Sequence, residues 1–392
     1  MKKPAPNAYG ISAGSYQNGD GAPRIDYGAL TWRQPAAAGH AALAPATWQS
    51  AAWQPAAMHA RQPAGLHSLG GATMGTTWSL RLANPGYLPL APIRALVQQT
   101  LDAVVAQMSN WEPDSALGRY NAAAPGTWHE LPPEFAAVLD AALHWARACG
   151  GAWDPAVGAL VALWGFGPRA NPDTQHGPHG GQPPAPDAIA AALRLCGHQR
   201  LQWQPATAST PPRLLQPGGL QLDLSGIAKG FAVDWAARRL QAAGWEHALL
   251  EIGGELRAWG QRPGGQPWRV AVAGVAGGET LAVPLADGAL ASSGDHWHAF
   301  EHGGRRYSHT LDPRTGQPVA HALTSVTVHH AECMHADALA TVLTVLGPQA
   351  GWDFALAQHV AAAFHTHPDA AHPQGLRRCT PAWRQQFELS KK

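Results

Sequence analysis

The chain has 392 residues, of which 45% are hydrophobic, and this is enough for one large domain or two modest ones. Its formal net charge is +1 and its 27 basic residues are scattered, which excludes a basic surface built for nucleic acid or for an anionic membrane. Four well-separated cysteines exclude a disulfide scaffold, and no stretch reaches the roughly 20 apolar residues of a transmembrane helix.

The N-terminal 68 residues are predicted to be a flexible or irregular extension, because they are rich in Ala, Pro, Gly and Gln and show no sustained period. The main domain is expected over residues 69–385, followed by a short tail over residues 386–392. Tyr27, Trp32, Trp48 and Trp53 give the extension apolar side chains that would pack on the main domain if it folds back.

Periodicity and stop signals predict the elements of the first half. A strand is predicted over Met74 to Leu82. Apolar residues at helical spacing predict a helix from Pro92 to Met108, and a second helix is expected over about Pro133 to Cys149. Residues 167–186, rich in Pro, Gly and His, indicate a surface loop. A short helix is predicted from Asp187 to about Cys196.

In the second half, Leu220, Leu222 and Leu224 alternate like a strand, and a helix follows from about Lys229 to Gly244. The Gly253-Gly254 pair predicts a hairpin between two strands. Strands are expected over residues 248–252, 255–259, 268–273, 324–329 and 360–366. Because helices and strands interleave without a regular βαβ rhythm, we expect an α+β fold with mixed, largely antiparallel sheets and packed helices, not a Rossmann fold.

Two segments carry the strongest chemical signal. Residues 223–230 form a strand-to-helix junction of small residues, which is typical of a backbone site for an anion. Residues 336–341 are predicted to be helical, so Asp337 and Thr341 lie four apart on one face. A carboxylate, a hydroxyl and a backbone carbonyl suit magnesium, which usually keeps phosphate oxygens as further ligands. The pair therefore indicates a site for a metal-chelated phosphate ester.

Dinucleotide motifs of the usual kinds are absent from the sequence. Gly70 and Gly75 have P-loop spacing, but Thr76 stands where the phosphate-binding Lys belongs, and no G-x-G-x-x-G follows a strand. A dinucleotide would therefore bind by another route.

The two segments, together with six further motifs in the same order, resemble the FAD:protein FMN transferase (ApbE-type) family. The resemblance covers roughly residues 69–385, the expected catalytic domain. The further motifs are Thr73–Thr76, Met108–Ser115 running to Asn121, Trp153–Gly158 with Leu163–Gly167, Glu251–Glu255, Ser292–Gly294 and Tyr307–Gly316.

The resemblance implies a set of site residues. The metal would be held by Gly226, Asp337 and Thr341. FAD would be bound by Met74, Trp111, Ala152, Trp153, Asp154, Asp223, Lys229, His309 and Leu311. His309 and Asp337 are the implied catalytic residues, and each is a candidate general base beside a metal-bound hydroxide.

Structural explanations compete with these roles. Asp223 has the position of a helix-capping acid, and Asp337 that of an acid that compensates a helix dipole. Met74 and Trp111 suit contact with a flavin ring, but a lone Met or Trp is more often a core residue. Among 21 histidines, His309 is singled out only by the resemblance.

The implied reaction is magnesium-dependent transfer of the FMN moiety of FAD to a threonine hydroxyl of an acceptor protein, with release of AMP. The alternatives are a magnesium-dependent FAD pyrophosphatase and a non-catalytic flavin carrier. Because the chain shows neither the apolar core of a signal peptide nor a lipid-anchor cysteine before Cys149, we expect a cytoplasmic protein. The alternative is the periplasmic side of the inner membrane, if the N-terminus is misassigned.

Overall fold

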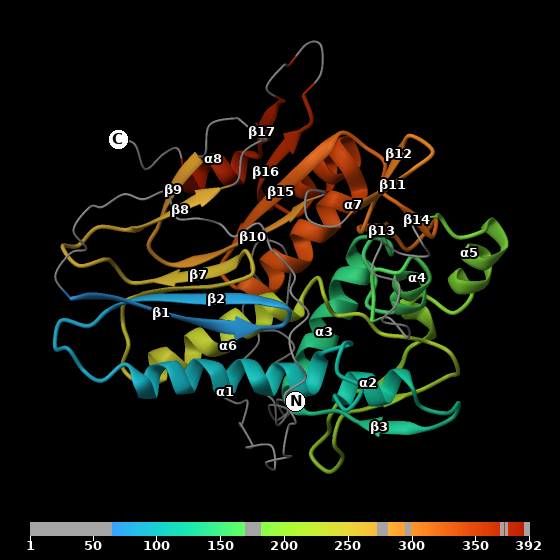
Figure 1. Cartoon of the computed structure of the whole chain (residues 1–392), viewed down its shortest axis with the longest axis horizontal. Coiled ribbons are helices and arrows are strands. Elements are labelled where there is room, and N and C mark those ends of the chain that lie inside the picture. The colour runs from blue at the N-terminus through green and yellow to red at the C-terminus, as the bar shows by residue number, and fades with distance from the viewer. Residues whose placement is uncertain are drawn as a thin grey trace, which may run out of the picture.

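The structure is a computed structural model that describes residues 65–168, 182–272, 281–294, 299–368, 372 and 375–387. The predicted extension up to residue 64 and most of the predicted loop over residues 167–186 lie outside these ranges. The described residues are built around one large sheet with the long helices packed on one face (Figure 1). Among them, no helix is long and apolar enough to cross a membrane.

The central sheet has eight strands, and every neighbouring pair is antiparallel. In spatial order the strands are β1 (Leu66–Thr73), β2 (Thr76–Ala83), β6 (Ala248–Ile252), β7 (Glu255–Trp259), β10 (Gly288–Gly294), β15 (Leu323–His330), β16 (Ala361–Thr366) and β17 (Arg377–Cys379). The expected α+β class with antiparallel sheets, and without a Rossmann arrangement, is therefore confirmed.

The remaining elements surround this sheet. The helices are α1 (Ala91–Met108), α2 (Ala116–Asn121), α3 (Pro133–Ala148), α4 (Gly158–Leu163), α5 (Pro186–Leu193), α6 (Ala228–Ala242), α7 (Cys333–Ala357) and α8 (Pro381–Phe387). The small sheets are β3 (Trp128–Glu130), β5 (Arg213–Leu215) and β4 (Gln202–Gln204); β8 (Trp268–Val272) and β9 (Leu281–Leu285); β11 (Ala299–His302) and β12 (Arg305–Ser308); and β13 (Leu311–Asp312) and β14 (Gln317–Pro318).

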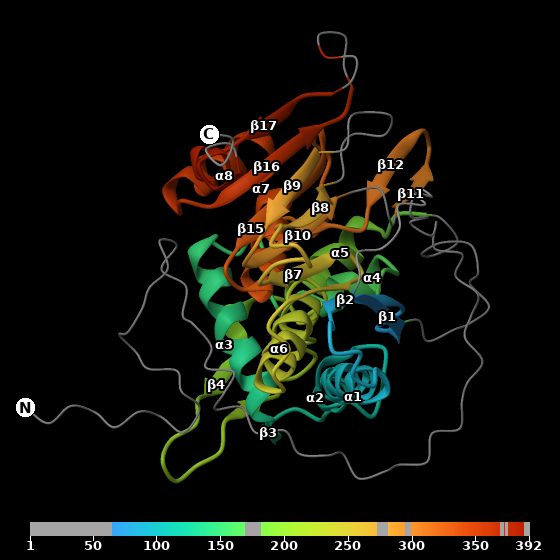
Figure 2. The same ribbon diagram turned by 90° about the vertical axis from the view of Figure 1, so that its left-hand side faces the viewer.

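Two layers of side chains hold the sheet. On one face, α6 packs between α1 and α7, and α7 lies across β10 and β15 (Figure 2). This main core takes in apolar residues from both ends of the chain, such as Leu80 and Val328. On the other face, α8 and the β8–β9 hairpin enclose a second core around Trp268 and Trp383. The antiparallel sheet is thus covered on both faces, which fixes the strand register.

The structure confirms one predicted strand and corrects another. The strand expected over Met74 to Leu82 is β2, which begins at Thr76, because Met74 lies in the turn between β1 and β2 with a positive φ of 49°. Leu220, Leu222 and Leu224 are buried as predicted but form no ladder. Instead the side chain of Asn121 bonds both the N–H and the C=O of Leu222, at 2.7 and 2.9 Å. An amide side chain thus takes the place of a neighbouring strand.

Candidate functional site

One end of the central sheet brings two hairpin turns together. The β1–β2 turn carries Met74, and the β6–β7 turn is formed by Gly253 and Gly254. The amide of Gly253 donates a hydrogen bond to the Thr77 carbonyl at 3.1 Å, which joins the two turns. Met74 is half-buried and packs against the main core. The joined turns place Met74 at the same end of the sheet as Glu255, the first residue of β7.

The first turns of α6 and α7 cap each other. Asp337 Oδ2, from α7, accepts a hydrogen bond from the Gly230 amide of α6 at 3.0 Å. Asp234 Oδ2, from α6, accepts one from the Met334 amide of α7 at 2.9 Å. Each carboxylate satisfies an amide that its partner helix leaves without an internal acceptor. The two helices therefore hold one another with their N-termini side by side.

This arrangement corrects the capping explanation of Asp223. The Asp223 side chain bonds the Ser225 amide at 2.8 Å and so closes the turn before α6, and it does not cap the helix. The amides of Ile227 and Ala228 both donate to the Leu224 carbonyl. Four amides of this junction are thus already bonded, counting Ser225 and Gly230. The prediction that these amides are available to bind an anion is wrong for these four, because the Asp337 carboxylate and the acceptors of the local turns already accept their hydrogen bonds.

The three residues proposed as metal ligands converge. A Cβ added at Gly226 would lie 3.1 Å from Thr341 Oγ1 and 2.9 Å from Trp153 Nε1. Thr341 Oγ1 lies 3.4 Å from the carbonyl oxygen of Asp337, one helical turn earlier, so both face the same way. Gly226 therefore approaches the Thr341 hydroxyl and the Trp153 indole N–H too closely for any side chain at this position, and the Asp337 carboxylate lies on the Gly230 amide, four residues further along.

The charges around Asp337 are tightly packed. Burial first, and then the adjacent Glu255 carboxylate, raise the pKa of Asp337 to about 8. Lys229, in the first turn of α6, forms an ion pair with Glu255. Burial acts to lower the Lys229 pKa, but the carboxylates of Glu255 and Asp337 outweigh it and raise that pKa. A bound cation would stabilise the ionised form of this carboxylate, which burial and the Glu255 charge otherwise disfavour.

An exposed tryptophan lies on a loop that is tied to this site. The loop after α1 is closed by Ser115, and its Asn110 side chain donates to Asp223 Oδ2 at 2.9 Å. The next residue, Trp111, has 59% of its surface exposed. The interpretation of Trp111 as a core residue is therefore wrong, whereas a large exposed ring next to the Asp223 turn suits a stacking surface.

Trp153 and Asp154 come from the segment after α3. Ala152 is fully buried, and Trp153 is nearly so. The Asp154 carboxylate accepts hydrogen bonds from the His198 amide at 2.8 Å and from the Ala156 amide at 2.8 Å, and it contacts His198 Nδ1 at 2.6 Å. These bonds fix the segment in place. They give Asp154 a structural role, and a direct contact with FAD stays a prediction.

His309 and Leu311 flank a different cluster. His309 is half-buried, and its ring meets that of Phe166 edge-on at 6.3 Å. Leu311 is buried with Trp164, whose indole N–H donates to the Gly316 carbonyl at 2.9 Å. These contacts attach the two residues to α4 and to the β13–β14 turn. The catalytic role of His309 stays a prediction.

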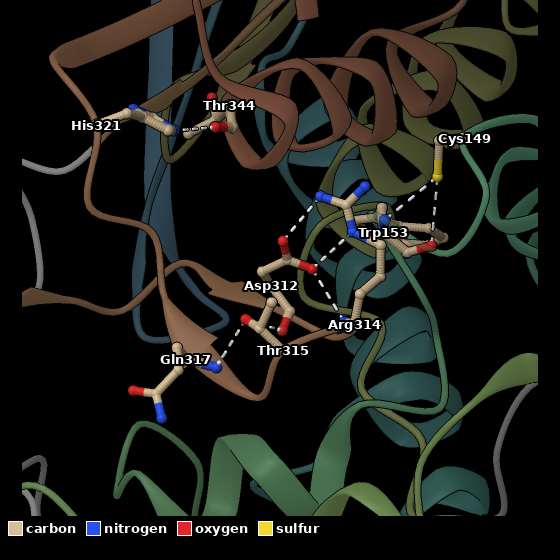
Figure 3. A network of polar contacts seen from close by, with 8 residues as sticks. All are labelled: Cys149, Trp153, Asp312, Arg314, Thr315, Gln317, His321 and Thr344. Carbon is tan, nitrogen blue, oxygen red and sulfur yellow. Dashed lines mark hydrogen bonds and ion pairs between the residues drawn. The ribbon is translucent and has the colours of Figure 1, made fainter. Parts of the chain in front are cut away.

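The β13–β14 turn reaches back toward Trp153. Asp312 accepts hydrogen bonds from Arg314 Nε at 2.9 Å and Nη2 at 2.8 Å, which fixes the guanidinium. Arg314 lies near the buried Cys149 thiol, whose sulfur accepts a hydrogen bond from the Trp153 amide at 3.2 Å (Figure 3). The turn that follows His309 is thus connected to the segment that borders Gly226.

The sequence did not single out three residues that organise the site. Glu255 holds Lys229, Asp234 caps α7, and Asn110 bonds Asp223. Glu255 and Asn110 had a signal, since they lie within the Glu251–Glu255 and Met108–Ser115 motifs, and Asp234 had none. In the described part of the chain, no three His, Cys, Asp or Glu residues cluster as metal ligands. A cation here would therefore rely on one carboxylate together with neutral oxygen donors.

The fold and the site define a class of α+β protein without a Rossmann motif. In this class, two helix N-termini cap each other beside a buried acid (Asp337) and a hydroxyl (Thr341), and an exposed aromatic ring (Trp111) lies on a loop tied to the same site. Residues 74–364 match the model of the ApbE family. The chain belongs to this family, and the resemblance seen in the motifs is confirmed.

Named relatives agree with this assignment. The FAD:protein FMN transferase of Vibrio cholerae is 36% identical over 304 residues, covering 76% of this chain and 87% of the relative. The enzyme of the same name from Haemophilus influenzae is 36% identical over 289 residues, covering 71% of this chain and 80% of the relative.

Solved structures have the same fold. The apo form of the Pseudomonas stutzeri flavinyl transferase ApbE superposes with a TM-score of 0.72 and 34% identity, covering 82% of this chain and 96% of that one. The flavin transferase ApbE from Vibrio cholerae gives a TM-score of 0.71 with 32% identity, covering 83% of this chain and 100% of that one.

Proposed function

We propose that this protein transfers the FMN moiety of FAD to a threonine hydroxyl of an acceptor protein, in a magnesium-dependent reaction that releases AMP. Relatives of similar length are named FAD:protein FMN transferase. The observation that carries the proposal is the convergence of Gly226, Thr341 and Asp337 at the paired N-termini of α6 and α7. This donor set belongs with a chelated pyrophosphate.

The residues present fit magnesium. The space at Gly226 would be filled by any Cβ, and the donors around it are oxygens, which magnesium prefers. We propose that the Gly226 carbonyl, the Asp337 carboxylate and the Thr341 hydroxyl hold the ion. When bound, it would neutralise charge on the pyrophosphate and on the departing AMP.

The protein's own groups would position FAD for the transfer. Trp111 would stack on the isoalloxazine ring, and the Lys229 ammonium would face the phosphates. The threonine oxygen of the acceptor attacks the phosphorus on the FMN side, the P–O bond to AMP breaks, and AMP leaves with that bond's electrons. The proton of the hydroxyl passes to a general base, for which His309 and Asp337 are the proposed groups. Positioning and charge neutralisation supply most of the rate in such transfers.

The test is to incubate the protein with FAD, magnesium and a threonine-containing acceptor domain and to measure the acceptor's mass. A gain equal to one FMN, absent when the threonine is changed to valine, is the expected result. Release of AMP with no mass gain would identify a pyrophosphatase instead. FAD binding without either product would identify a carrier.

Replacing Trp111 by alanine should weaken FAD binding by roughly 1–3 kcal/mol, the range of aromatic–base stacks. Because the ring is mostly exposed, the free energy of unfolding should change little. Titration of FAD fluorescence measures the affinity. Trp128→Ala is the matched control, since Trp128 is also an exposed tryptophan but lies on β3 beside Arg213. Equal losses in both variants would contradict a stacking role for Trp111.

A further inference from the structure

We propose that Glu255 is a positioning residue that holds the Lys229 ammonium away from Asp337 and so keeps the Asp337 carboxylate available for magnesium. The proposal rests on the magnesium site of the proposed function. Glu255 is a buried carboxylate, and none of the metal-ligand or FAD-binding roles proposed above involves it.

The ion pair between Lys229 and Glu255 joins two rigid elements. Lys229 is in the first turn of α6, and Glu255 is the first residue of β7, directly after the Gly253-Gly254 turn. The side chain of Glu255 is only 3% exposed, whereas that of Lys229 is 30% exposed. The carboxylate is therefore the fixed partner, and the flexible lysine is the one that it orients.

Asp337 competes for the same ammonium. Its Oδ2 bonds the amide of Gly230, the residue next to Lys229, and its charge interacts with those of both Lys229 and Glu255. Among the described residues, the Lys229 ammonium nevertheless forms its ion pair with the Glu255 carboxylate. No oxygen of the Asp337 carboxylate lies within 4.0 Å of the Lys229 ammonium nitrogen. One ammonium is thus shared unequally between two buried carboxylates.

The backbone enforces this choice. Glu255 pairs with Ile252 to close the β6–β7 hairpin, and the Gly254 amide donates to Glu251 Oε1 at 2.8 Å. The hairpin thus fixes the backbone of Glu255, and because its side chain is also buried, the carboxylate loses little further conformational freedom on pairing. With the Glu255 charge removed, Asp337 is the remaining carboxylate whose charge acts on Lys229, so the ammonium would be drawn toward it. An ammonium on Asp337 would block the oxygen that the cation needs.

The test measures magnesium binding itself, by isothermal titration of the full chain without FAD. Glu255→Gln keeps the size and hydrogen-bonding capacity of the side chain, and it should weaken magnesium affinity roughly tenfold. Adding Lys229→Met removes the competing ammonium. The double variant Lys229→Met/Glu255→Gln should therefore bind magnesium as tightly as Lys229→Met alone.

Comparing the effect of Glu255→Gln on magnesium affinity with and without Lys229→Met distinguishes a positioning role from a purely electrostatic effect of the Glu255 charge. If Glu255 acted only by adding negative potential, its substitution would weaken binding equally in both backgrounds, and the proposal would be overturned. Glu251→Gln removes a charge from the same hairpin and should leave magnesium affinity within about twofold. A similar loss in that control would also overturn the proposal.

Two further outcomes separate this proposal from the proposed function. Wild-type protein that binds no magnesium would overturn both. Wild-type protein that binds magnesium, with Glu255→Gln binding equally well, would overturn the positioning role alone. If Glu255→Gln does not fold, the double variant, in which both charges of the Lys229–Glu255 pair are removed, is compared with Lys229→Met instead; weaker binding in the double variant would then overturn the proposal.

Discussion

Asp337→Asn should lower FMN transfer in the presence of magnesium by roughly 10²–10⁴-fold, because a bound metal ion contributes several kcal/mol at the transition state. Asparagine keeps the size of the side chain and an oxygen that accepts the Gly230 amide, so the α6–α7 contact should persist. FAD should still bind through its ring contacts. The measurement is the rate of acceptor mass gain, with FAD affinity determined separately by fluorescence.

The matched control is Asp353→Asn, the same substitution at an exposed position in the part of α7 that follows its break at Gly347. It should leave turnover unchanged. Thr341→Ala removes a neutral donor and should cause a smaller loss than Asp337→Asn. If Asp337→Asn retains both FMN transfer and FAD hydrolysis, the metal site assigned to Gly226, Asp337 and Thr341 is wrong.

Asp337→Asn should also change how the free energy of unfolding depends on pH. The folded protein raises the pKa of Asp337 from 3.8 to about 8, so the folded state holds this proton more tightly than the unfolded state. Without magnesium, this group should make the free energy of unfolding fall as the pH rises from about 4 to about 8. Magnesium binds the ionised form and should oppose the loss. Denaturant unfolding of wild type and Asp337→Asn across this range measures the difference.

Gly230→Ala should lower the free energy of unfolding by about 1–3 kcal/mol, the usual range for overpacking. In an ordinary helix the same change stabilises by up to about 1 kcal/mol, so the sign of the effect is diagnostic. A Cβ at Gly230 would collide with the Cys333 carbonyl oxygen and lie 2.8 Å from the Asp337 Cβ. It would force α7 away from α6, so FMN transfer should fall as well.

Gly86→Ala is the control for this experiment. Gly86 has no positive φ, and a Cβ there would meet nothing within 4 Å. Its unfolding midpoint should therefore match that of wild type. A Gly230→Ala protein as stable as wild type would show that the two helix N-termini are not in close contact.

Local sequence signals determined much of the framework. Apolar residues at helical spacing correctly predicted α1 and α3, because such a stripe must face a core wherever the helix lies. The Gly253-Gly254 pair correctly predicted the β6–β7 hairpin, since both residues take positive φ values. The spacing of Asp337 and Thr341 placed them on one face of α7, as found. These features depend on neighbours within a few residues.

Contacts between distant residues decided the rest, because no local pattern encodes them. Leu222 alternates with its neighbours like a strand residue, yet it pairs with the side chain of Asn121, 101 positions away. Asp337 is fifth in its own helix, and only the packing of α7 on α6 makes it a cap for Gly230, 107 positions earlier. The sequence by itself determined which residue types are available for a cation and a phosphate. Only the tertiary structure decided that Glu255 holds the Lys229 ammonium, because a choice between two carboxylates depends on distances across the fold.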